Sequence, residues 1–384
     1  MNKKLAIIST HPIQYYAPVF EMMAKQTNLK VFYTWGEQSI EKFDKGFNKD
    51  IKWDLPLLEG YKYLFLENRA SDPGTHHFNG IINPHLIREI SAYKPDAILI
   101  YGWAWQAHLK AIVFFKGKIP IYFRGDSTLL NKSVGLLNLL KTFFLRWIYR
   151  HIDIAFYVGK ENKSYYEKYG LKQHQLRFAP HAIDNNRFSV DKISEATSIR
   201  ERLGIGKHEI LILFAGKFDL VKNPTLLLEV FIELNAKDVH LLFVGNGILE
   251  KTLKIKNKKK EADPKKIHFM DFQNQSQMPA IYQACDLFCL PSSSETWGLS
   301  VNEAMASGKA ILVSDQVACA KELIEPGING DIFKSGDSED LKDKLRNLTS
   351  NKNTLKVYGK ASEKIIKTWT FERQAESIIK TLNF

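Results

Sequence analysis

Residues 287–308 read LFCLPSSSETWGLSVNEAMASG. An apolar run over residues 287–290 is followed by a loop of small residues, and a helix is predicted to begin near Leu299. The apolar run is continuous rather than alternating, which is typical of a parallel strand buried on both faces. A strand, a loop and a helix in this order form the repeating unit of doubly wound α/β folds.

The same unit recurs along the chain, as short apolar runs that alternate with longer amphipathic segments. The predicted strands are residues 5–9, 29–33, 97–101, 119–123, 154–158, 210–215, 239–244, 266–270, 287–290 and 310–314. A stretch without periodicity near residues 180–189 separates the two series. The sequence therefore predicts an α/β protein with two Rossmann-like, doubly wound parallel-sheet domains, residues 1–185 and 186–368, facing a cleft.

The composition is that of a globular protein. The 384 residues are 45% hydrophobic and 25% charged, which excludes a disordered chain, a collagen and a coiled coil. Only three cysteines are present, which excludes a disulfide scaffold. Cys285, Cys289 and Cys319 have no supporting histidine at ligand spacing, so we expect them to be buried rather than bound to metal.

Positive charge is concentrated in the first half of the chain. The net charge is +12, and residues 1–190 carry 26 Lys and Arg against 16 Asp and Glu. Such a basic face attracts nucleic acid, anionic lipid or a phosphorylated ligand. No recognisable nucleic-acid-binding module accompanies it, so no nucleic-acid partner is expected. The lysine-rich residues 251–266 are interpreted as a solvated helix and loop.

Residues 129–150 combine Leu, Phe and Trp with Lys and Arg. A basic amphipathic helix of this kind binds membrane surfaces, while the alternative is an ordinary helix packed on the sheet. Lys132, Lys141 and Arg146 interrupt the apolar run, which excludes a membrane span. Residues 5–8 form too short an apolar core for a signal peptide. We expect a cytoplasmic protein, peripheral on the inner face of the cytoplasmic membrane through residues 129–150.

The loop over residues 291–298 is a candidate anion site. A loop that leads into a helix N-terminus presents backbone N–H groups and the positive end of the helix dipole, which together bind phosphate. Gly298 lets the backbone approach a ligand closely. Glu295 lies in the loop and Glu303 about one turn inside the helix. The alternative makes Glu295 a helix cap and places Glu303 on a solvated face.

A second candidate anion site follows the strand at residues 210–215. Gly216 turns the chain, and Lys217 and Lys222 flank a loop that leads to a helix starting near Pro224. Two cations beside a helix N-terminus would neutralise a diphosphate. The alternative is that both lysines are solvated surface residues.

Together these motifs resemble the large family of retaining glycosyltransferases that have the GT-B fold, a Glu-x7-Glu motif and nucleotide-sugar donors. Glu295 and Glu303 have that spacing. Gly216-Lys217 followed by Lys222 is similar to the family's Gly-Arg and Lys pair, and residues 180–188 resemble its Pro-Asn-Gly-Val-Asp…Phe segment. The resemblance is strong over residues 178–370. It implies an acceptor-binding first domain, a donor-binding second domain and a C-terminal helix, residues 369–384, that packs back on the first domain.

The resemblance also implies roles for individual residues. The lysines and the backbone at Gly298 would hold the donor diphosphate, Glu303 would accept hydrogen bonds from the ribose, and Asp271 and Phe272 would recognise the base. The implied donor-binding residues are Gly216, Lys217, Lys222, Asp271, Phe272, Glu295, Thr296, Trp297, Gly298, Leu299 and Glu303. The implied catalytic residues are Glu295, Asp126, Lys217 and Lys222.

Three departures from the family pattern lie at the site. Lys217 stands where Arg is usual, which keeps the charge and loses the bidentate fork. Asp126 stands where the family has a His near the donor sugar, within the string Arg124-Gly125-Asp126. The first strand runs into a loop with His11 and Gln14 in place of a glycine-rich one. His11, Gln14 and Arg124 are candidate cleft contacts.

The implied function is transfer of a hexose-type sugar from a nucleoside diphosphate sugar to an acceptor hydroxyl with retention, in bacterial surface polysaccharide, lipopolysaccharide or glycan assembly. The partners would be the nucleotide-sugar donor and a glycan or lipid-linked acceptor, with no metal and no cofactor. One alternative is a nucleotide-sugar epimerase or synthase on this fold. Another is a non-catalytic nucleotide- or glycan-binding scaffold. An NAD dehydrogenase is disfavoured, because no Gly-x-Gly-x-x-Gly follows the first strand.

Overall fold

The computed structural model describes residues 3–40, 42–44, 46–47, 49–130, 136–259 and 264–383. The chain forms two compact units. The first comprises Met1–Lys42, Leu55–His181 and Phe371–Phe384, and the second comprises Phe43–Asp54 and Ala182–Thr370. The twelve residues 43–54 were predicted to be part of the N-terminal domain, and the structure places them with the second unit instead.

The first unit contains a seven-stranded parallel sheet in the order β5-β2-β1-β6-β7-β8-β9. Its central strands are buried, as continuous apolar runs require. The strands are β1 (Lys4–Ser9), β2 (Asn28–Tyr33), β5 (Lys62–Phe65), β6 (Ala97–Tyr101), β7 (Ile121–Arg124), β8 (Ile154–Tyr157) and β9 (Leu176–Phe178).

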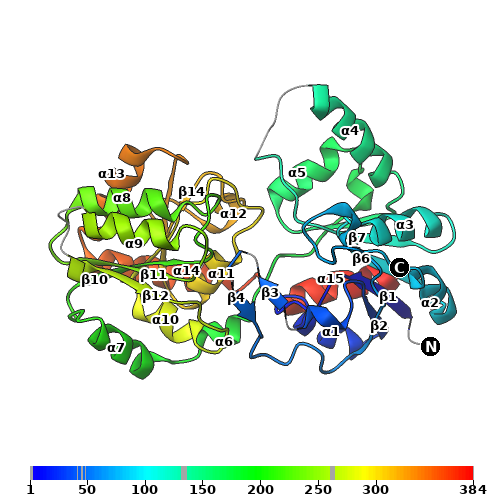
Figure 1. The fold of residues 1–384 in the computed structure, drawn as a ribbon, viewed down its shortest axis with the longest axis horizontal. Helices are drawn as coiled ribbons and strands as arrows, with labels where there is room; N and C mark the ends of the chain where they lie inside the picture. The colour runs from blue at the N-terminus through cyan, green and yellow to red at the C-terminus, as the bar shows by residue number, and fades with distance from the viewer. Residues whose placement is uncertain are drawn as a thin grey trace. The chain divides into compact units, whose positions relative to one another are not determined.

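Helices cover both faces of this sheet (Figure 1). Ile121 and Phe123 of β7 face a core that helices α2 (Leu86–Tyr93), α3 (Gln106–Phe115), α4 (Leu136–Tyr149) and α5 (Lys160–Lys168) complete. Tyr122 points to the opposite face because side chains alternate along a strand. There its hydroxyl donates a hydrogen bond of 3.1 Å to the carbonyl of Thr381 in α15 (Phe371–Asn383), which packs against α1 (Ala17–Ala24).

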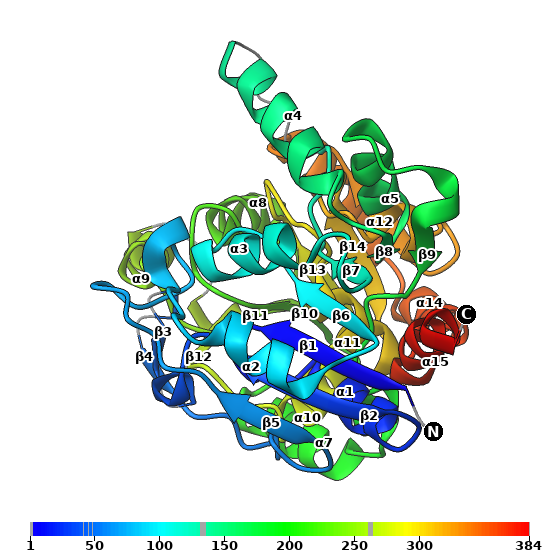
Figure 2. The same ribbon diagram turned by 90° about the vertical axis from the view of Figure 1, so that its right-hand side faces the viewer.

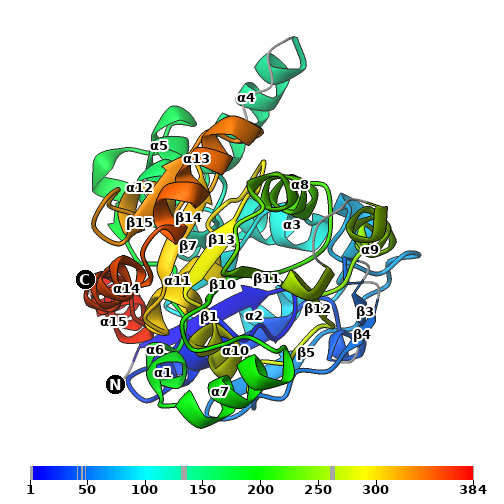
Figure 3. The ribbon, with the colours of Figure 1, turned by 90° about the vertical axis from the view of Figure 1, so that its left-hand side faces the viewer.

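The second unit contains a six-stranded parallel sheet in the order β12-β11-β10-β13-β14-β15. One face packs on α8, α9 and α13, which lie side by side in Figures 1 and 3. The strands are β10 (Ile210–Ala215), β11 (Val239–Val244), β12 (Ile267–Met270), β13 (Leu287–Leu290), β14 (Ala310–Ser314) and β15 (Gly330–Phe333). The helices are α6 (Asn185–Ser189), α7 (Ile193–Arg202), α8 (Pro224–Leu234), α9 (Glu250–Lys259), α10 (Met278–Ala284), α11 (Leu299–Ala306), α12 (Ala320–Leu323), α13 (Ser338–Thr349) and α14 (Lys352–Ile366).

The predicted α/β class is confirmed in each unit, and all ten predicted strands are present to within two residues. The strands that the sequence did not reveal in these sheets are β5, β9 and β15. All three lie at sheet edges. An edge strand pairs on one side only and keeps part of its side chains exposed, so it lacks the continuous apolar run that marks a central strand. The short pair β3 (Lys42–Asp44) and β4 (Lys49–Ile51) was also not predicted.

Candidate functional site

The candidate site of the second unit lies where the strand order reverses. From β10 the chain proceeds through β11 and β12 to one edge of the sheet, and from β13 through β14 and β15 to the other. The loops that follow β10 and β13 therefore leave the sheet in opposite directions. In open α/β sheets ligands bind at this point, outside the carboxyl ends of the strands.

The two loops are joined directly. The backbone N–H of Ser293 donates a hydrogen bond of 2.8 Å to the carbonyl of Val221. The ammonium of Lys222 forms an ion pair with the carboxylate of Glu295, and their side chains are 24% and 15% exposed. Two motifs more than seventy residues apart in sequence thus meet at one place. The alternative that Lys222 is a solvated surface lysine is wrong.

The loop after β10 is fixed by short-range polar contacts. The Lys222 N–H donates 2.8 Å to Oδ1 of Asp219. Asn223 has left-handed backbone (φ 49°), and its side chain caps α8, which begins at Pro224 as predicted. Lys217, at the start of the loop, is half-buried, and its ammonium lies 4.9 Å from the ring centroid of Phe47. The loop therefore holds both cations close to the carboxyl end of β10.

The loop after β13 is held in an extended form by the segment that follows β14. Glu295 N–H donates 3.0 Å to the carbonyl of Gln316, and the Glu295 carbonyl accepts 3.2 Å from the N–H of Ala318. Gly298 then turns the chain with φ 100° into α11, an end that no side chain caps. A Cβ there would lie 3.0 Å from Val317 Cγ1. The backbone angle favours glycine at this position, and Val317 leaves little room for a Cβ.

Thr296 and Trp297 have different surroundings within this loop. Thr296 is exposed, whereas Trp297 is 2% exposed. The Trp297 ring packs 5.0 Å from that of Trp369, and its Nε1 donates 3.0 Å to Oδ1 of Asn302 in α11. Its side chain therefore supports the loop from inside. Because the Trp297 side chain is buried, the predicted donor-binding role of this residue would fall to its backbone groups alone.

Glu303 is a buried carboxylate on α11. It is 3% exposed and accepts a hydrogen bond of 2.8 Å from the hydroxyl of Tyr282 in α10. The alternative of a solvated helix face is therefore wrong. A buried carboxylate is retained only where polar partners compensate for its lost hydration, and it can accept further hydrogen bonds from ligand hydroxyls. Helix α11 ends at Ala306, and Gly308, two residues further on, has left-handed backbone with φ 70°.

Asp271 and Phe272 follow β12 and are held by Asn246, from the loop after β11. The Asn246 side chain donates 3.2 Å to Oδ1 of Asp271 and accepts 2.7 Å from the N–H of Phe272. Asn246 lies between two glycines, in the segment Gly245-Asn246-Gly247 that follows β11. The structure shows that its amide positions both predicted base-binding residues.

The predicted residues of the first unit lie at the carboxyl ends of β1 and β7. His11 Nδ1 is 2.8 Å from Thr10 Oγ1, and its ring meets that of Trp35 edge-on at 5.3 Å. Gln14 is 9% exposed. Asp126 is half-buried two residues after β7. Burial raises the pKa of Tyr16, and the nearby charge of Asp126 raises it further.

Arg124 is 2% exposed and serves the backbone of its own unit. Nη1 donates 2.7 Å to the carbonyl of Ala179, and Nη2 donates 3.1 Å to that of Pro180. The prediction that Arg124 contacts a ligand is not favoured, because its guanidinium binds these buried carbonyls. Arg124 instead fixes the end of the first unit, immediately before the chain enters the second.

Arg124→Ala is expected to lower the free energy of unfolding by about 3 kcal/mol or more, since each hydrogen bond from a charged donor contributes about 1.5–3 kcal/mol and two carbonyls lose their partner. Urea denaturation followed by circular dichroism measures this. Arg88→Ala is the matched control: the Arg88 side chain is 69% exposed and should change stability by less than about 0.5 kcal/mol. Equal stability of the two variants would contradict the structural role.

The three cysteines are buried, as predicted. Burial raises the pKa of Cys285 to about 12, so this thiol is not a nucleophile at neutral pH. Burial likewise lowers the pKa of His108 to about 4. His108 is therefore neutral at pH 7, and its ring bridges Thr34 Oγ1 and the Gly102 carbonyl at 2.8 and 3.0 Å.

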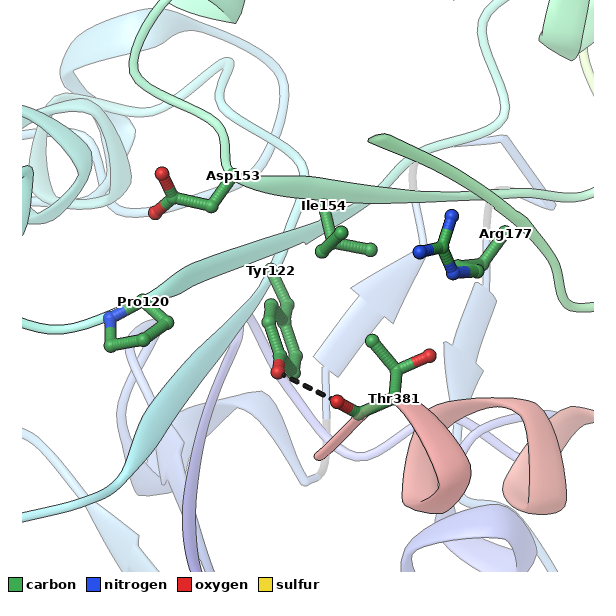
Figure 4. A pocket seen from close by; sticks show the side chains of 6 residues that line it. All are labelled: Pro120, Tyr122, Asp153, Ile154, Arg177 and Thr381. Carbon is green, nitrogen blue, oxygen red and sulfur yellow. Dashed lines mark hydrogen bonds between the residues drawn. The ribbon is translucent and has the colours of Figure 1, made fainter. Parts of the chain in front are cut away.

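A pocket in the first unit lies at the amino ends of β7 and β8, opposite to the carboxyl ends that carry the predicted residues (Figure 4). It is lined by Pro120, Tyr122, Asp153, Ile154, Arg177 and Thr381. Asp153 is already engaged there, since its carboxylate accepts from the ammonium of Lys116 (2.6 Å) and the N–H of Ile121 (2.8 Å). None of the lining residues is a predicted site residue, because ligands of such sheets bind at the carboxyl ends of the strands.

Among the described residues, Asp72, His76 and His77 are the one group whose ligand atoms lie close enough to share a metal ion, within 4.8 Å of one another. Asp72 and His76 are exposed, and the group belongs to the loop after β5 in the first unit. It contains no residue of the candidate site in the second unit.

The comparisons with known proteins agree with this arrangement. Residues 195–365 match the model of the family described as glycosyl transferases group 1. The matched segment contains both motif loops and all of α11.

Relatives extend the likeness along the chain. It is 26% identical over 297 residues to the sulfoquinovosyl transferase SQD2 of Arabidopsis thaliana, covering 73% of this chain and 55% of that protein. It is 33% identical over 159 residues to the mannosylfructose-phosphate synthase of Agrobacterium fabrum, covering 38% and 34%. The chain spans about half or less of the length of these curated relatives. HepE of Anabaena, solved with UDP and glucose, shares the fold over 99% of both chains, with a TM-score of 0.73 at 17% identity.

Proposed function

We propose that the chain transfers a hexose-type sugar from a nucleoside diphosphate sugar to an acceptor hydroxyl, with retention of anomeric configuration. The observation that carries the proposal is the meeting of Lys222 and Glu295 at the strand-order reversal, with Glu303 buried one turn into the helix that follows. HepE was solved with UDP-glucose as well as with UDP, which supports a nucleotide-sugar donor for this fold.

The chemistry assigned to these residues is charge stabilisation and orientation. Positive charge is supplied by Lys217, Lys222 and the N-terminus of α11. It would stabilise the negative charge that develops on the diphosphate as it leaves, which lowers the barrier to that step. Glu303 would accept hydrogen bonds from the ribose. Glu295 would face the donor sugar. Retention requires the acceptor hydroxyl to attack from the face that the diphosphate leaves, so positioning of the acceptor supplies the rest of the rate.

The proposal is tested by a thermal-shift panel of UDP, GDP, ADP, CMP and their common sugars, with and without Mg²⁺. A ligand that binds only the folded state raises the melting temperature by mass action. We expect one nucleoside diphosphate and its sugars to raise it, irrespective of Mg²⁺. The absence of a shift with every nucleoside diphosphate would contradict the donor assignment.

We further propose that the acceptor is membrane-associated, in surface polysaccharide, lipopolysaccharide or glycan assembly, and that α4 binds the inner face of the cytoplasmic membrane. No helix among the described residues has the length and hydropathy to cross a bilayer. Helix α4 extends beyond the sheet of its own unit (Figure 2) and exposes large apolar side chains. They are Leu139 (57%), Leu140 (64%), Phe143 (68%), Phe144 (42%) and Trp147 (39%). Lys132 of the predicted amphipathic stretch lies outside the described residues.

The charge around α4 favours an anionic surface. Residues 129–150 contain four Lys and Arg and no Asp or Glu, and each basic residue near an anionic membrane contributes about 1 kcal/mol. Phe143→Glu is therefore expected to reduce binding to vesicles containing phosphatidylglycerol by about tenfold or more, since burying a Phe side chain contributes about 1.5–3 kcal/mol.

Vesicle co-sedimentation measures this binding. Val357→Glu, on α14 at 63% exposure, is the control and should bind like the wild type. Equal binding of Phe143→Glu and Val357→Glu would rule out α4 as the contact.

A further inference from the structure

Residues 43–54 are tied to the loop that follows β12. In sequence they lie between β2 and β5 of the first unit, but they group with the second. The Asn274 side chain donates 2.7 Å to the carbonyl of Lys52. The carboxylate of Asp54 accepts hydrogen bonds from the N–H (3.1 Å) and the hydroxyl of Ser276. These bonds dock the segment beside Asp271 and Phe272, the predicted base-binding residues.

The docked segment places two aromatic rings on Phe272. Phe47 meets the Phe272 ring at 4.9 Å with 66° between the planes, and Trp53 meets it at 6.1 Å with 68°. Phe47, Trp53 and Phe272 are each only half-buried. Three rings therefore gather at the carboxyl end of β12 while keeping part of their surface open to solvent.

The same segment also reaches the phosphate end of the candidate site. The Lys217 ammonium lies 4.9 Å from the centroid of the Phe47 ring. A Cβ built on Gly46 would come within 2.5 Å of Lys217 Nζ, so the backbone at this position abuts the lysine side chain. From Phe272 through Phe47 to Lys217, the site passes from aromatic rings to a cation. A nucleoside diphosphate passes in the same order from a planar base to two phosphates.

We propose that the described residues of the 43–54 segment complete the base subsite of the donor-binding unit, with Phe47 and Trp53 as binding residues for a planar aromatic base. The inference rests on the proposed use of a nucleoside diphosphate sugar. Stacking on an aromatic ring contributes to the affinity for any base, because every base has a π face. The choice between bases would then depend on polar groups such as the Asp271 carboxylate.

The test is isothermal titration of the full chain with UDP, GDP and ADP, and with inorganic pyrophosphate as a probe that lacks the base. Phe47→Leu keeps apolar bulk and removes the π face. It is expected to weaken binding of the nucleoside diphosphate with the highest affinity by at least about fivefold, because stacking of one base contributes about 1–3 kcal/mol to binding. Pyrophosphate binding should stay within about twofold, and Phe47→Tyr should bind like the wild type. Trp53→Leu should resemble Phe47→Leu.

Phe78→Leu is the matched control, because Phe78 is a 41% exposed phenylalanine of the first unit. If the wild type binds no nucleoside diphosphate, the donor assignment itself is wrong. If the wild type binds one and Phe47→Leu and Trp53→Leu bind it equally well, only the base subsite is wrong, and residues 43–54 are a packing element. Equal weakening of nucleotide and pyrophosphate would also overturn the base subsite, because the effect would then act through Lys217.

Discussion

Glu303→Ala is expected to weaken binding of the nucleoside diphosphate by about tenfold to a hundredfold, since a hydrogen bond to a charged group contributes about 1.5–3 kcal/mol. Glu303 is 3% exposed and has a positioned donor in Tyr282, so its carboxylate is fixed in place before any ligand arrives. Removal of the carboxylate takes away a preorganised acceptor for hydroxyl groups. Isothermal titration with the nucleotide selected by the thermal-shift panel measures the loss.

Tyr282→Phe distinguishes the contribution of the Glu303 carboxylate to ligand binding from the contribution of the hydroxyl that positions it. This variant keeps the Glu303 carboxylate and removes only the hydroxyl that holds it, so its loss of affinity should be smaller than that of Glu303→Ala. Circular dichroism establishes that each variant is folded. A folded Glu303→Ala with wild-type affinity would show that Glu303 has no part in the donor site.

Lys222→Ala is expected to lower kcat/KM for sugar transfer by about tenfold or more. A cation beside the leaving diphosphate stabilises the transition state more than the bound substrate, because negative charge develops on the diphosphate as it departs. Without ligand, Lys222 is paired with Glu295, so the variant also leaves a partly buried carboxylate without its cation. The nearby negative charge would then repel the diphosphate. Steady-state kinetics with the identified donor measures the change, and Lys222→Arg should recover part of the rate.

Lys237→Ala is the control for this prediction, because Lys237 is exposed in the turn between α8 and β11 and touches neither motif loop. It removes the same charge from the same unit. Similar losses in the Lys222 and Lys237 variants would mean that net charge, rather than the position of Lys222, governs turnover.

The meeting of Lys222 and Glu295 could be predicted from the sequence, because both residues follow strands that are buried on both faces. Strands of that kind are marked by continuous apolar runs, and their carboxyl ends share one edge of a sheet. The glycine before α11 could be predicted for a similar local reason. Its φ of 100° and the small loop residues before it belong to one short stretch of chain.

The burial of Glu303 could not be predicted in this way. The residues around it, NEAMASG, contain no wide apolar stripe, and α11 is enclosed because α6, α10 and α14 pack against it. The same reasoning applies to residues 43–54. Their charged and aromatic residues have no periodicity, and the groups that dock them, Asn274 and Ser276, lie about 220 residues further along the chain. The hydrogen bonds of Arg124 to the backbone could not be predicted either, because every residue carries a carbonyl that could accept them.

The position of α15 has a consequence for biosynthesis. The first unit needs α15 against α1, with Ile378, Ile379 and Leu382 buried, yet these residues are translated only after the whole of the second unit. While residues 182–370 are made, that face of the first sheet is therefore covered by α1 without α15. The second unit can reach its final structure earlier than the first, the reverse of the usual N-terminal-first order.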